Sequence, residues 1–295
     1  MLSSVRAFLW QKSHTVHTIA TIIQQLTHDL DRCSTTPRLD AELLVAYLLK
    51  TTRTRLILLH RDPFPPTHAS ALADLRQRRL AGESIAYLTN TREFYGIDLY
   101  VDARVLVPRP ESELLVDLAI AAAQRLNATT VADICTGSGC IALAIAHTNP
   151  QLTVIATDIS PDALAVARIN RGTLNLTPRV HLVQADLCTP LMPIPIIVSN
   201  PPYTILSDID ANVRDFEPHL ALAGGDEDGA SFYRTLAHLL HHHLARPGFF
   251  ACELDPRQAD IVAQLLQNAF PDGIVTSHRD LAGHVRVVAI DVPPR

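Results

Sequence analysis

From about residue 129 onward, short apolar runs alternate with stretches in which apolar residues recur at helical spacing. Short apolar runs are typical of buried strands, and spacings of three and four residues are typical of helices that pack on them. The predicted strands are 131–134, 152–157, 180–184, 194–199 and 249–253, with two more between 274 and 290. The predicted helices are 139–147, 161–172, 230–244 and 256–269. Such alternation predicts a sheet of the α/β class, largely parallel, with helices on both faces.

The first 90 residues have a different pattern, in which helical spacing dominates. Five large residues recur at a spacing that predicts one buried helix face: Leu39, Leu43, Leu44, Tyr47 and Leu48. The prolines within 63–66 interrupt the pattern, and residues 69–80 return to it. We therefore expect a small helical domain over residues 1–90.

Aromatic and β-branched residues between these regions predict a short β-hairpin. Residues 93–97 and 98–101 are its expected strands. We expect the hairpin to form a linker over residues 91–110, followed by the α/β domain over residues 111–295.

Composition narrows the possible functions. The formal net charge of −5 over 295 residues gives no sign of the basic face with which proteins bind nucleic acid. Five cysteines without C-x-x-C spacing argue against a disulfide framework or zinc site and fit a reducing compartment. No apolar run reaches the roughly 18 residues that span a bilayer. We expect a soluble cytoplasmic protein without a metal, a membrane or a stable nucleic-acid partner.

A turn containing two glycines joins the first predicted strand of the sheet to the next helix. Its residues are Cys135, Thr136, Gly137, Ser138 and Gly139. Glycines let the backbone approach a ligand closely, and successive N–H groups can form a concave polar nest. By itself, the pattern describes an ordinary strand–helix turn equally well.

Two acids point to a nucleoside beside this turn. Asp158 ends the second strand, where a carboxylate can accept from ribose hydroxyls, and Asp186 ends the third, where it can accept from an adenine amino group. Either acid could instead cap the following element. The turn lacks the full G-x-G-x-x-G spacing and no Walker lysine follows, so S-adenosyl-L-methionine (SAM) fits better than a dinucleotide.

The tetrapeptide Asn200, Pro201, Pro202 and Tyr203 follows the fourth strand and is the most specific chemical signal. The Asn200 side-chain carbonyl and the Pro201 backbone carbonyl can accept both protons of an amide and free the lone pair of its nitrogen. Proline fixes φ, so its carbonyl is rigidly directed, and Tyr203 can cover the flat face of the guest. A carboxamide or the amino edge of a nucleobase suits this slot, while a simple strand stop is the structural alternative.

Four further stretches, besides this tetrapeptide, match one known family: residues 36–44, 92–96, 107–113 and 213–218. Over nearly its full length the chain resembles the peptide chain release factor N5-glutamine methyltransferases, the PrmC/HemK family. The resemblance implies a Rossmann-like, seven-stranded SAM-dependent methyltransferase domain, with a small N-terminal helical domain for substrate recognition and a linking β-hairpin. It also implies the substrate, which is the glutamine of the Gly-Gly-Gln motif in class 1 release factors.

The resemblance assigns site residues by position. The implied SAM contacts are Cys135, Thr136, Gly137, Ser138, Gly139, Asp158, Asp186, Leu187 and Asn200. The implied substrate contacts and catalytic residues are Asn200, Pro201, Pro202 and Tyr203, with Arg109 and Glu111 at the border of the pocket. Many members have glycine at Cys135 and an aromatic at Leu187. We expect a monomer, because the enzyme must embrace a whole protein domain.

Other readings remain open at this point. A sister group methylates a glutamine of a ribosomal protein, and the stretches 135–140 and 158–163 resemble that group too, although 108–113 and the N-terminal domain favour the release factor group. An adenine-N6 methyltransferase suits the tetrapeptide but needs a basic recognition domain for base flipping. A non-catalytic SAM-binding module is disfavoured by the intact tetrapeptide. Glu217 and Glu253 could place a proton or the SAM amino group, or form caps or ion pairs.

Overall fold

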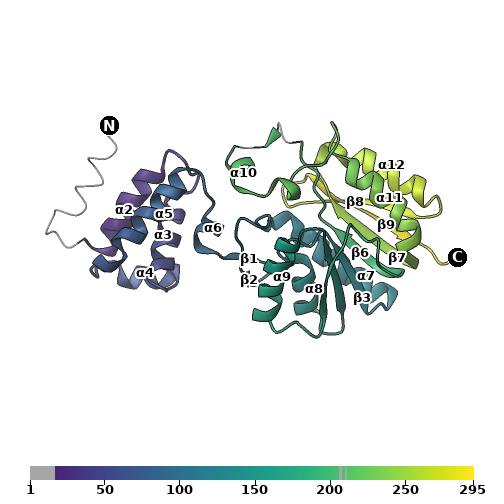
Figure 1. Cartoon of the computed structure of the whole chain (residues 1–295), viewed down its shortest axis with the longest axis horizontal. Coiled ribbons are helices and arrows are strands. Elements are labelled where there is room, and N and C mark those ends of the chain that lie inside the picture. Colours follow the sequence, from purple (N-terminus) through teal and green to yellow (C-terminus); the bar gives the residue numbers. More distant parts are fainter. Residues whose placement is uncertain (1–16, 206–207, 210) are drawn as a thin grey trace. The chain divides into compact units, whose positions relative to one another are not determined.

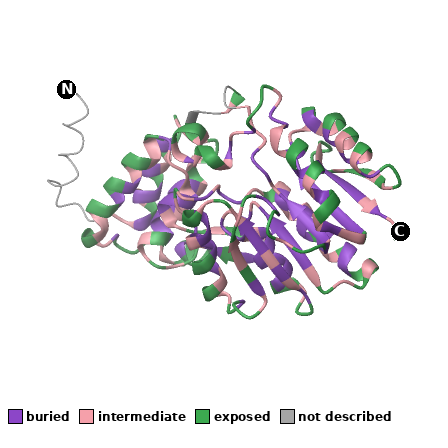
Figure 2. Cartoon of the chain, turned by 45° about the vertical axis from the view of Figure 1, so that its right-hand side comes forward, coloured by how far each residue is buried: buried purple, intermediate pink, exposed green. Residues whose placement is uncertain are grey.

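The computed structural model describes residues 17–205, 208–209 and 211–295. They belong to two compact units that divide between Thr89 and Asn90 (Figure 1). Each unit has a hydrophobic core of its own. Buried residues follow the strands and the inner sides of the helices (Figure 2).

The first unit is helical, as predicted. Its helices are α2 (Ile19–Leu30), α3 (Pro37–Leu48), α4 (Arg53–Leu59), α5 (Ala69–Leu80) and α6 (Ile85–Thr89). The side chains of Thr18 and Thr52 cap α2 and α4 by accepting backbone N–H groups of the first turns.

The buried face predicted for α3 was partly wrong. Tyr47 is 44% exposed, whereas Ala41, Leu44 and Val45 are fully buried. Because α3 packs mainly against α2, the side of α3 that faces α2 is buried, and this side lies about one residue further along the chain than the predicted row of large residues.

The β-hairpin consists of β1 (Arg92–Phe94) and β2 (Ile97–Leu99), which pair antiparallel. Its turn lies at Tyr95 and Gly96, so the predicted turn after residue 97 was wrong. Both turn residues have positive φ, +51° and +76°, which is the twist that two-residue hairpin turns favour. The backbone N–H of Tyr95 donates to Glu113 Oε1 at 2.9 Å, so the hairpin is held to the helix that begins at Glu113, within the second unit.

The seven-stranded sheet confirms the predicted Rossmann-like α/β fold. Its strands are β3 (Thr130–Ile134), β4 (Thr153–Asp158), β5 (Val180–Gln184), β6 (Ile194–Ser199), β7 (Leu244–Glu253), β8 (Ile274–Arg279) and β9 (Val285–Val292). The spatial order is β5-β4-β3-β6-β7-β9-β8. The first five of these strands run parallel, and β9 pairs antiparallel with both β7 and β8.

Helices cover both faces of this sheet. They are α7 (Glu113–Leu126), α8 (Cys140–Thr148), α9 (Pro161–Thr173), α11 (Ser231–His243) and α12 (Ala259–Ala269), with the short α10 (Ala211–Phe216) in a connection. Alternate side chains of a strand point to opposite faces. Ile196 and Val198 of β6 accordingly join the core with α7 and α8, while Ile197 joins the core with α11 and α12. Among the helices described, none is both long and apolar enough to cross a membrane.

The order of the strands places a ligand site beyond the carboxyl ends of the central strands of the sheet. After β3 the chain continues to β4 and β5 on one side, and then returns to form β6 on the other side of β3. Parallel sheets bind ligands beyond the carboxyl ends of the strands at such a switch point. The turn after β3, the end of β4 and the segment after β6 all meet there.

Candidate active site

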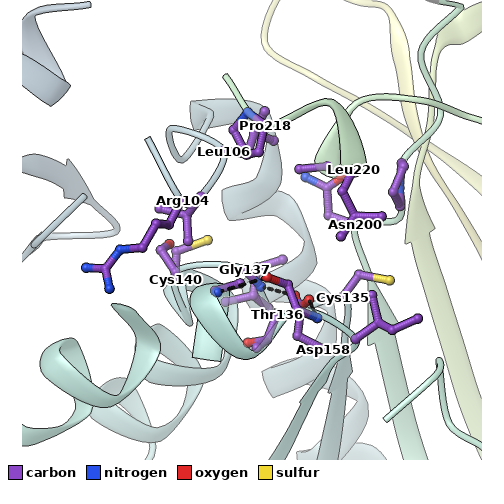
Figure 3. Close-up of a pocket in the computed structure, with 18 of the residues that line it drawn as sticks. Arg104, Leu106, Cys135, Thr136, Gly137, Cys140, Asp158, Asn200, Pro218 and Leu220 are labelled. Carbon is purple, nitrogen blue, oxygen red and sulfur yellow. Dashed lines mark hydrogen bonds between the residues drawn. The ribbon is translucent and has the colours of Figure 1, made fainter. Parts of the chain in front are cut away.

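A cavity opens beyond the carboxyl ends of β3, β4 and β6 (Figure 3). Ten of the residues predicted for the site line it: Arg109, Cys135, Thr136, Gly137, Ser138, Asp158, Asp186, Leu187, Asn200 and Pro202. Gly139, Pro201, Tyr203 and Glu111 lie outside its lining. The fold thus brings most of the glycine turn, both strand-end acids, and Asn200 and Pro202 of the tetrapeptide to one cavity.

The glycine turn uses unusual backbone conformations. Gly137 and Gly139 have φ of +57° and +82°, and Cys135 has φ of +62°. A Cβ at Gly139 would lie 3.1 Å from Leu143 Cδ1, whereas a Cβ at Gly137 would meet nothing within 4 Å. Gly139 therefore allows close packing on α8, and Gly137 leaves open space at the cavity where a ligand can approach.

Two unpaired polar atoms lie beneath this turn. Asp133 Oδ2 accepts from Thr136 Oγ1 at 2.6 Å and from the N–H of Ala142 at 3.1 Å. Asp133 Oδ1 and Ser138 Oγ are buried and have no hydrogen-bond partner among the described residues. Burial raises the pKa of Asp133 to about 7. Since buried polar atoms are normally paired, the turn fits a polar ligand group.

Asp158 and Asp186 differ in how far their carboxylates are engaged. Asp158 accepts the N–H of Gly137 at 2.8 Å and the N–H of Ser160 at 2.9 Å, and burial raises its pKa. The cap of α9 is Ser160 rather than Asp158. The exposed Asp186 carboxylate has no hydrogen-bond partner in the described part of the chain. Neither acid therefore caps a helix, and both retain lone pairs for a ligand.

The residue after Asp186 covers the floor of the cavity. Leu187 is 6% exposed and has φ of +51°. Its carbonyl accepts from the buried hydroxyl of Thr157 at 2.8 Å. Left-handed conformations cost non-glycine residues roughly 1–2 kcal/mol each. Leu187 and Cys135 therefore place backbone strain at two points of the cavity lining.

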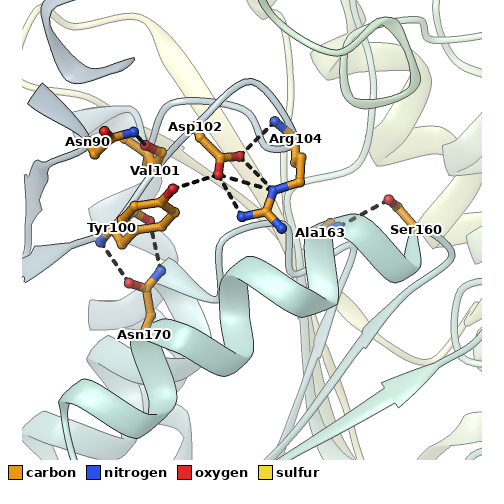
Figure 4. A network of polar contacts seen from close by, with 8 residues as sticks. All are labelled: Asn90, Tyr100, Val101, Asp102, Arg104, Ser160, Ala163 and Asn170. Carbon is orange, nitrogen blue, oxygen red and sulfur yellow. Dashed lines mark hydrogen bonds and ion pairs between the residues drawn. The ribbon is translucent and has the colours of Figure 1, made fainter. Parts of the chain in front are cut away.

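Asn170, which is 2% exposed, connects the segment around Tyr100 to the glycine turn. Figure 4 shows its hydrogen bonds with Tyr100. Its Oδ1 accepts the N–H of Tyr100 at 2.7 Å, and its Nδ2 donates to the carbonyls of Tyr100 and Ser138. Beyond this point the carboxylate of Asp102 accepts from Arg104 and from the Tyr100 hydroxyl, and the Arg104 guanidinium lowers the pKa of Asp102. Asn170 therefore fixes the segment around Tyr100 against Ser138 of the glycine turn.

The side chain of Asn200 is oriented by hydrogen bonds. Its Nδ2 donates to Ser112 Oγ at 3.0 Å, and the Ser112 hydroxyl donates to Glu253 Oε2 at 2.5 Å. Because that single hydroxyl proton is directed at the carboxylate, Ser112 can only accept from Asn200. Asn200 Oδ1 and the Pro201 carbonyl accept no hydrogen bond within the described residues, so both remain available as acceptors.

Tyr203 lies against the same carboxylate. Its hydroxyl donates to Glu253 Oε1 at 2.9 Å, and its carbonyl accepts from Gln258 Nε2 at 2.9 Å. Burial and the neighbouring carboxylate raise the pKa of Tyr203 well above its ordinary value, so it remains a hydrogen-bond donor. These contacts hold the end of the tetrapeptide in place.

The border of the cavity contains an ion pair. An Arg109 guanidinium nitrogen lies 2.6 Å from Glu217 Oε1, and Glu217 Oε2 accepts the N–H of Val107 at 3.1 Å. Of the roles left open for Glu217, the structure shows the ion pair.

Known protein families match both units. The PrmC N-terminal domain family matches residues 21–89, and the methyltransferase small domain family matches residues 111–215. The release factor glutamine methyltransferase of Rhodopirellula baltica is 39% identical over 267 residues, which cover 87% of this chain and 90% of the relative. That of Coxiella burnetii is 35% identical over 269 residues, covering 90% and 95%. The chain belongs to the release factor glutamine methyltransferase family. The predicted resemblance is confirmed.

Solved structures agree with the fold of this release factor glutamine methyltransferase family member. A methyltransferase from Pyrococcus furiosus superposes with a TM-score of 0.51 at 17% identity, over 76% of this chain and 100% of that one. The N-terminal domain of human METTL16 in complex with SAH gives a TM-score of 0.50 at 17% identity, over 84% and 94%. At such identity the likeness concerns the fold alone.

Several residues that line or support the site were not predicted from the sequence. Ser112 lies inside the matched stretch 107–113, so its position in a motif was a usable signal. Phe232, Leu220 and Asn170 carried no motif, because only the folded chain brings them to the cavity or its wall.

Proposed function

We propose that this chain transfers the methyl group of SAM to the side-chain amide nitrogen (N5) of the glutamine in the Gly-Gly-Gln motif of class 1 peptide chain release factors. Membership of the family supports the reaction and the substrate. The observation that carries the proposal is the Asn200 amide, whose nitrogen is tied to Ser112 and whose oxygen is left free next to Pro201.

The residues present fit SAM. The open face of Gly137 would take the part of SAM nearest the turn, Asp158 the ribose hydroxyls, and Asp186 with Leu187 the adenine. The same assignment gives Cys135, Thr136, Ser138 and Gly139 to the turn that shapes the cradle. When bound, SAM supplies an electrophilic methyl carbon on a positively charged sulfur.

The tetrapeptide prepares the glutamine for methylation. Asn200 Oδ1 and the Pro201 carbonyl accept the two amide protons from outside the amide plane, which localises the nitrogen lone pair. After the methyl group has been gained, the nitrogen has one proton too many, and this proton leaves to solvent water. No base is required for bond formation, so orientation dominates; well-oriented reactants gain about 7–11 kcal/mol. We assign Pro202 and Tyr203 to the shape of the slot, and Arg109 and Glu111 to its border.

Each part of the chain has its own role in this proposal. Residues 1–90 would recognise the release factor, 91–110 would link, and 111–295 would catalyse, in agreement with the family matches to 21–89 and 111–215. A cytoplasmic monomer without a stable nucleic-acid partner is part of the proposal. The net charge of −5 supports the expectation that no nucleic acid is bound, and the five free cysteines support a reducing compartment such as the cytoplasm.

Mass spectrometry of the Gly-Gly-Gln peptide tests the proposal directly. Incubation of a release factor with the enzyme and SAM should add one methyl group to that peptide, and Asn200→Ala should abolish the addition. A release factor whose Gly-Gly-Gln glutamine is replaced by alanine is the substrate control. Radiolabel that enters a ribosomal protein or nucleic acid, and leaves release factor unlabelled, would overturn the assignment.

A further inference from the structure

Ser112 ends the short 3-10 turn Pro110–Ser112, which leads directly into α7, and its own backbone is helical, with φ of −69° and ψ of −15°. A serine that caps a helix has an extended backbone and accepts an N–H of the first turn. The side chain of Ser112 accepts no such N–H, so its hydroxyl is free to bond elsewhere. Ser112 is 2% exposed, and its hydroxyl lies between Asn200, from which it accepts, and Glu253, to which it donates.

Glu253 is a buried carboxylate with two hydroxyl donors. It ends β7, is 1% exposed, and accepts from Ser112 at 2.5 Å and from Tyr203 at 2.9 Å. In the described part of the chain no arginine, lysine or histidine forms an ion pair with it. A buried charge costs free energy unless it is well hydrogen-bonded, so the site retains this group at an energetic cost.

We infer that Glu253 and Ser112 are positioning residues that set the orientation of the Asn200 amide for methyl transfer. The inference rests on the proposed function. Asparagine nitrogen and oxygen have nearly the same size, so shape alone does not decide which of them faces the substrate. Hydrogen bonding decides it: the carboxylate takes the serine proton, the serine oxygen then takes a proton from Asn200 Nδ2, and Oδ1 is left to accept from the glutamine.

The same carboxylate also fixes the other end of the tetrapeptide. Tyr203 donates to its second oxygen, so one charged group orients residues three positions apart on either side of the two prolines. Chains of hydrogen bonds polarise one another and strengthen at low local dielectric. Removing the Ser112 hydroxyl or the negative charge of Glu253 should therefore disturb the orientation of Asn200 without preventing SAM from binding.

The arrangement predicts a pH dependence. Burial raises the pKa of Glu253, against the lowering effect of the Ser112 and Tyr203 hydrogen bonds; Glu111 raises it further and Arg286 lowers it. Protonated Glu253 no longer needs the serine proton, and Ser112 can then donate to Asn200 Oδ1. Activity should thus rise with pH through the raised pKa of Glu253.

Four variants test the inference. Ser112→Ala should lower kcat about 10- to 100-fold, by analogy with the loss seen when the hydrogen-bond partners of metal ligands are removed. The Kd for SAM, measured by calorimetry, should stay unchanged. Ser112→Thr, which retains a hydroxyl, should restore most of kcat. Glu253→Gln should lower kcat and abolish the acid limb of the pH profile. Tyr233→Phe is the matched control, because Tyr233 donates only to the backbone carbonyl of Glu253.

A readout without turnover separates orientation from general damage. In nitrogen-15-labelled protein without ligand, a side-chain amide proton of Asn200 should exchange slowly in the wild type and in Tyr233→Phe, and rapidly in Ser112→Ala. A wild-type kcat in Ser112→Ala would overturn the positioning role of Ser112 and Glu253 while leaving the proposed function intact. Equally slow exchange in the wild type and in Ser112→Ala would do the same. Absence of release factor methylation by the wild type would instead sink the proposed function.

Discussion

The two halves of the cavity are built in different ways. On the cofactor side, backbone geometry defines the shape: three residues of the turn have positive φ, and the Gly137 N–H bonds to Asp158. On the substrate side, buried side chains define it, since Asn200, Ser112 and Glu253 form a hydrogen-bonded chain. This difference predicts which changes each half tolerates. Substitution of a polar side chain should impair the substrate half most, whereas a change in backbone freedom, such as glycine to alanine, should impair the cofactor half most.

The largest expected effect lies in the substrate half. Asn200→Ala should reduce kcat about a thousandfold or more, because one acceptor and the alignment of the amide are lost together. Single-turnover kinetics with release factor should show this loss. The Kd for SAM should change far less, and Tyr233→Phe should retain activity. A deficit confined to SAM binding would assign Asn200 to the cofactor half.

A pH effect on stability should come from the cofactor half. Asp133 has a pKa raised to about 7 by burial, from 3.8. Between these values the folded state binds more protons than the unfolded state, so wild-type stability should fall as pH rises from about 4 to 7, by roughly 4 kcal/mol at most.

The variant Asp133→Asn should not show this decline, since its amide does not ionise and one oxygen can still accept from Thr136 and Ala142. Urea unfolding at several pH values measures the difference. Parallel stability curves for the two proteins would contradict the prediction. Asp260→Asn, on an exposed position of α12, is the control.

The two glycines of the turn form a matched pair. Both Gly137→Ala and Gly139→Ala place a side chain at positive φ, at a cost of about 1–2 kcal/mol. Gly139→Ala should destabilise more, because its Cβ also crowds Leu143 and Ala167. Gly137→Ala should instead weaken SAM binding more than stability, since its Cβ enters open space at the cavity. Thermal unfolding and calorimetry distinguish the two; the reverse order would refute the argument.

The smallest effect should come from Cys135→Gly. Removing a side chain at φ +62° relieves strain, offset by the added freedom of glycine in the unfolded chain. We expect a gain of about 0.5–1 kcal/mol in the free energy of unfolding. Leu187→Gly is the counterpart: its φ is also positive, but it loses a buried side chain and should destabilise by about 1–2 kcal/mol. If denaturant titration shows Cys135→Gly to be less stable than the wild type, the packing of the Cys135 side chain contributes more free energy than its positive φ costs.

Much of the fold followed from local patterns. The apolar runs at 131–134 and 194–199 became central strands, because a parallel sheet covered on both faces requires continuous apolar runs. The glycine turn and the acids at the ends of β4 and β5 came together because the carboxyl ends of parallel strands share one edge. The hairpin turn at Tyr95 and Gly96 was missed, although the glycine, which adopts positive φ easily, was a local signal for a turn.

The sequence by itself determined the class of fold, the placement of the turn and acids, and the chemistry of the tetrapeptide. Tertiary structure decided how the side chains point: Ser112 meets Asn200 across 88 residues and Glu253 across 141, and Tyr203 meets Glu253 across 50. It also decided which face of α3 is buried. The physical reason is range: periodicity and turn chemistry act over a few residues, whereas the orientation of an amide depends on buried partners that only the packed chain brings within 3 Å.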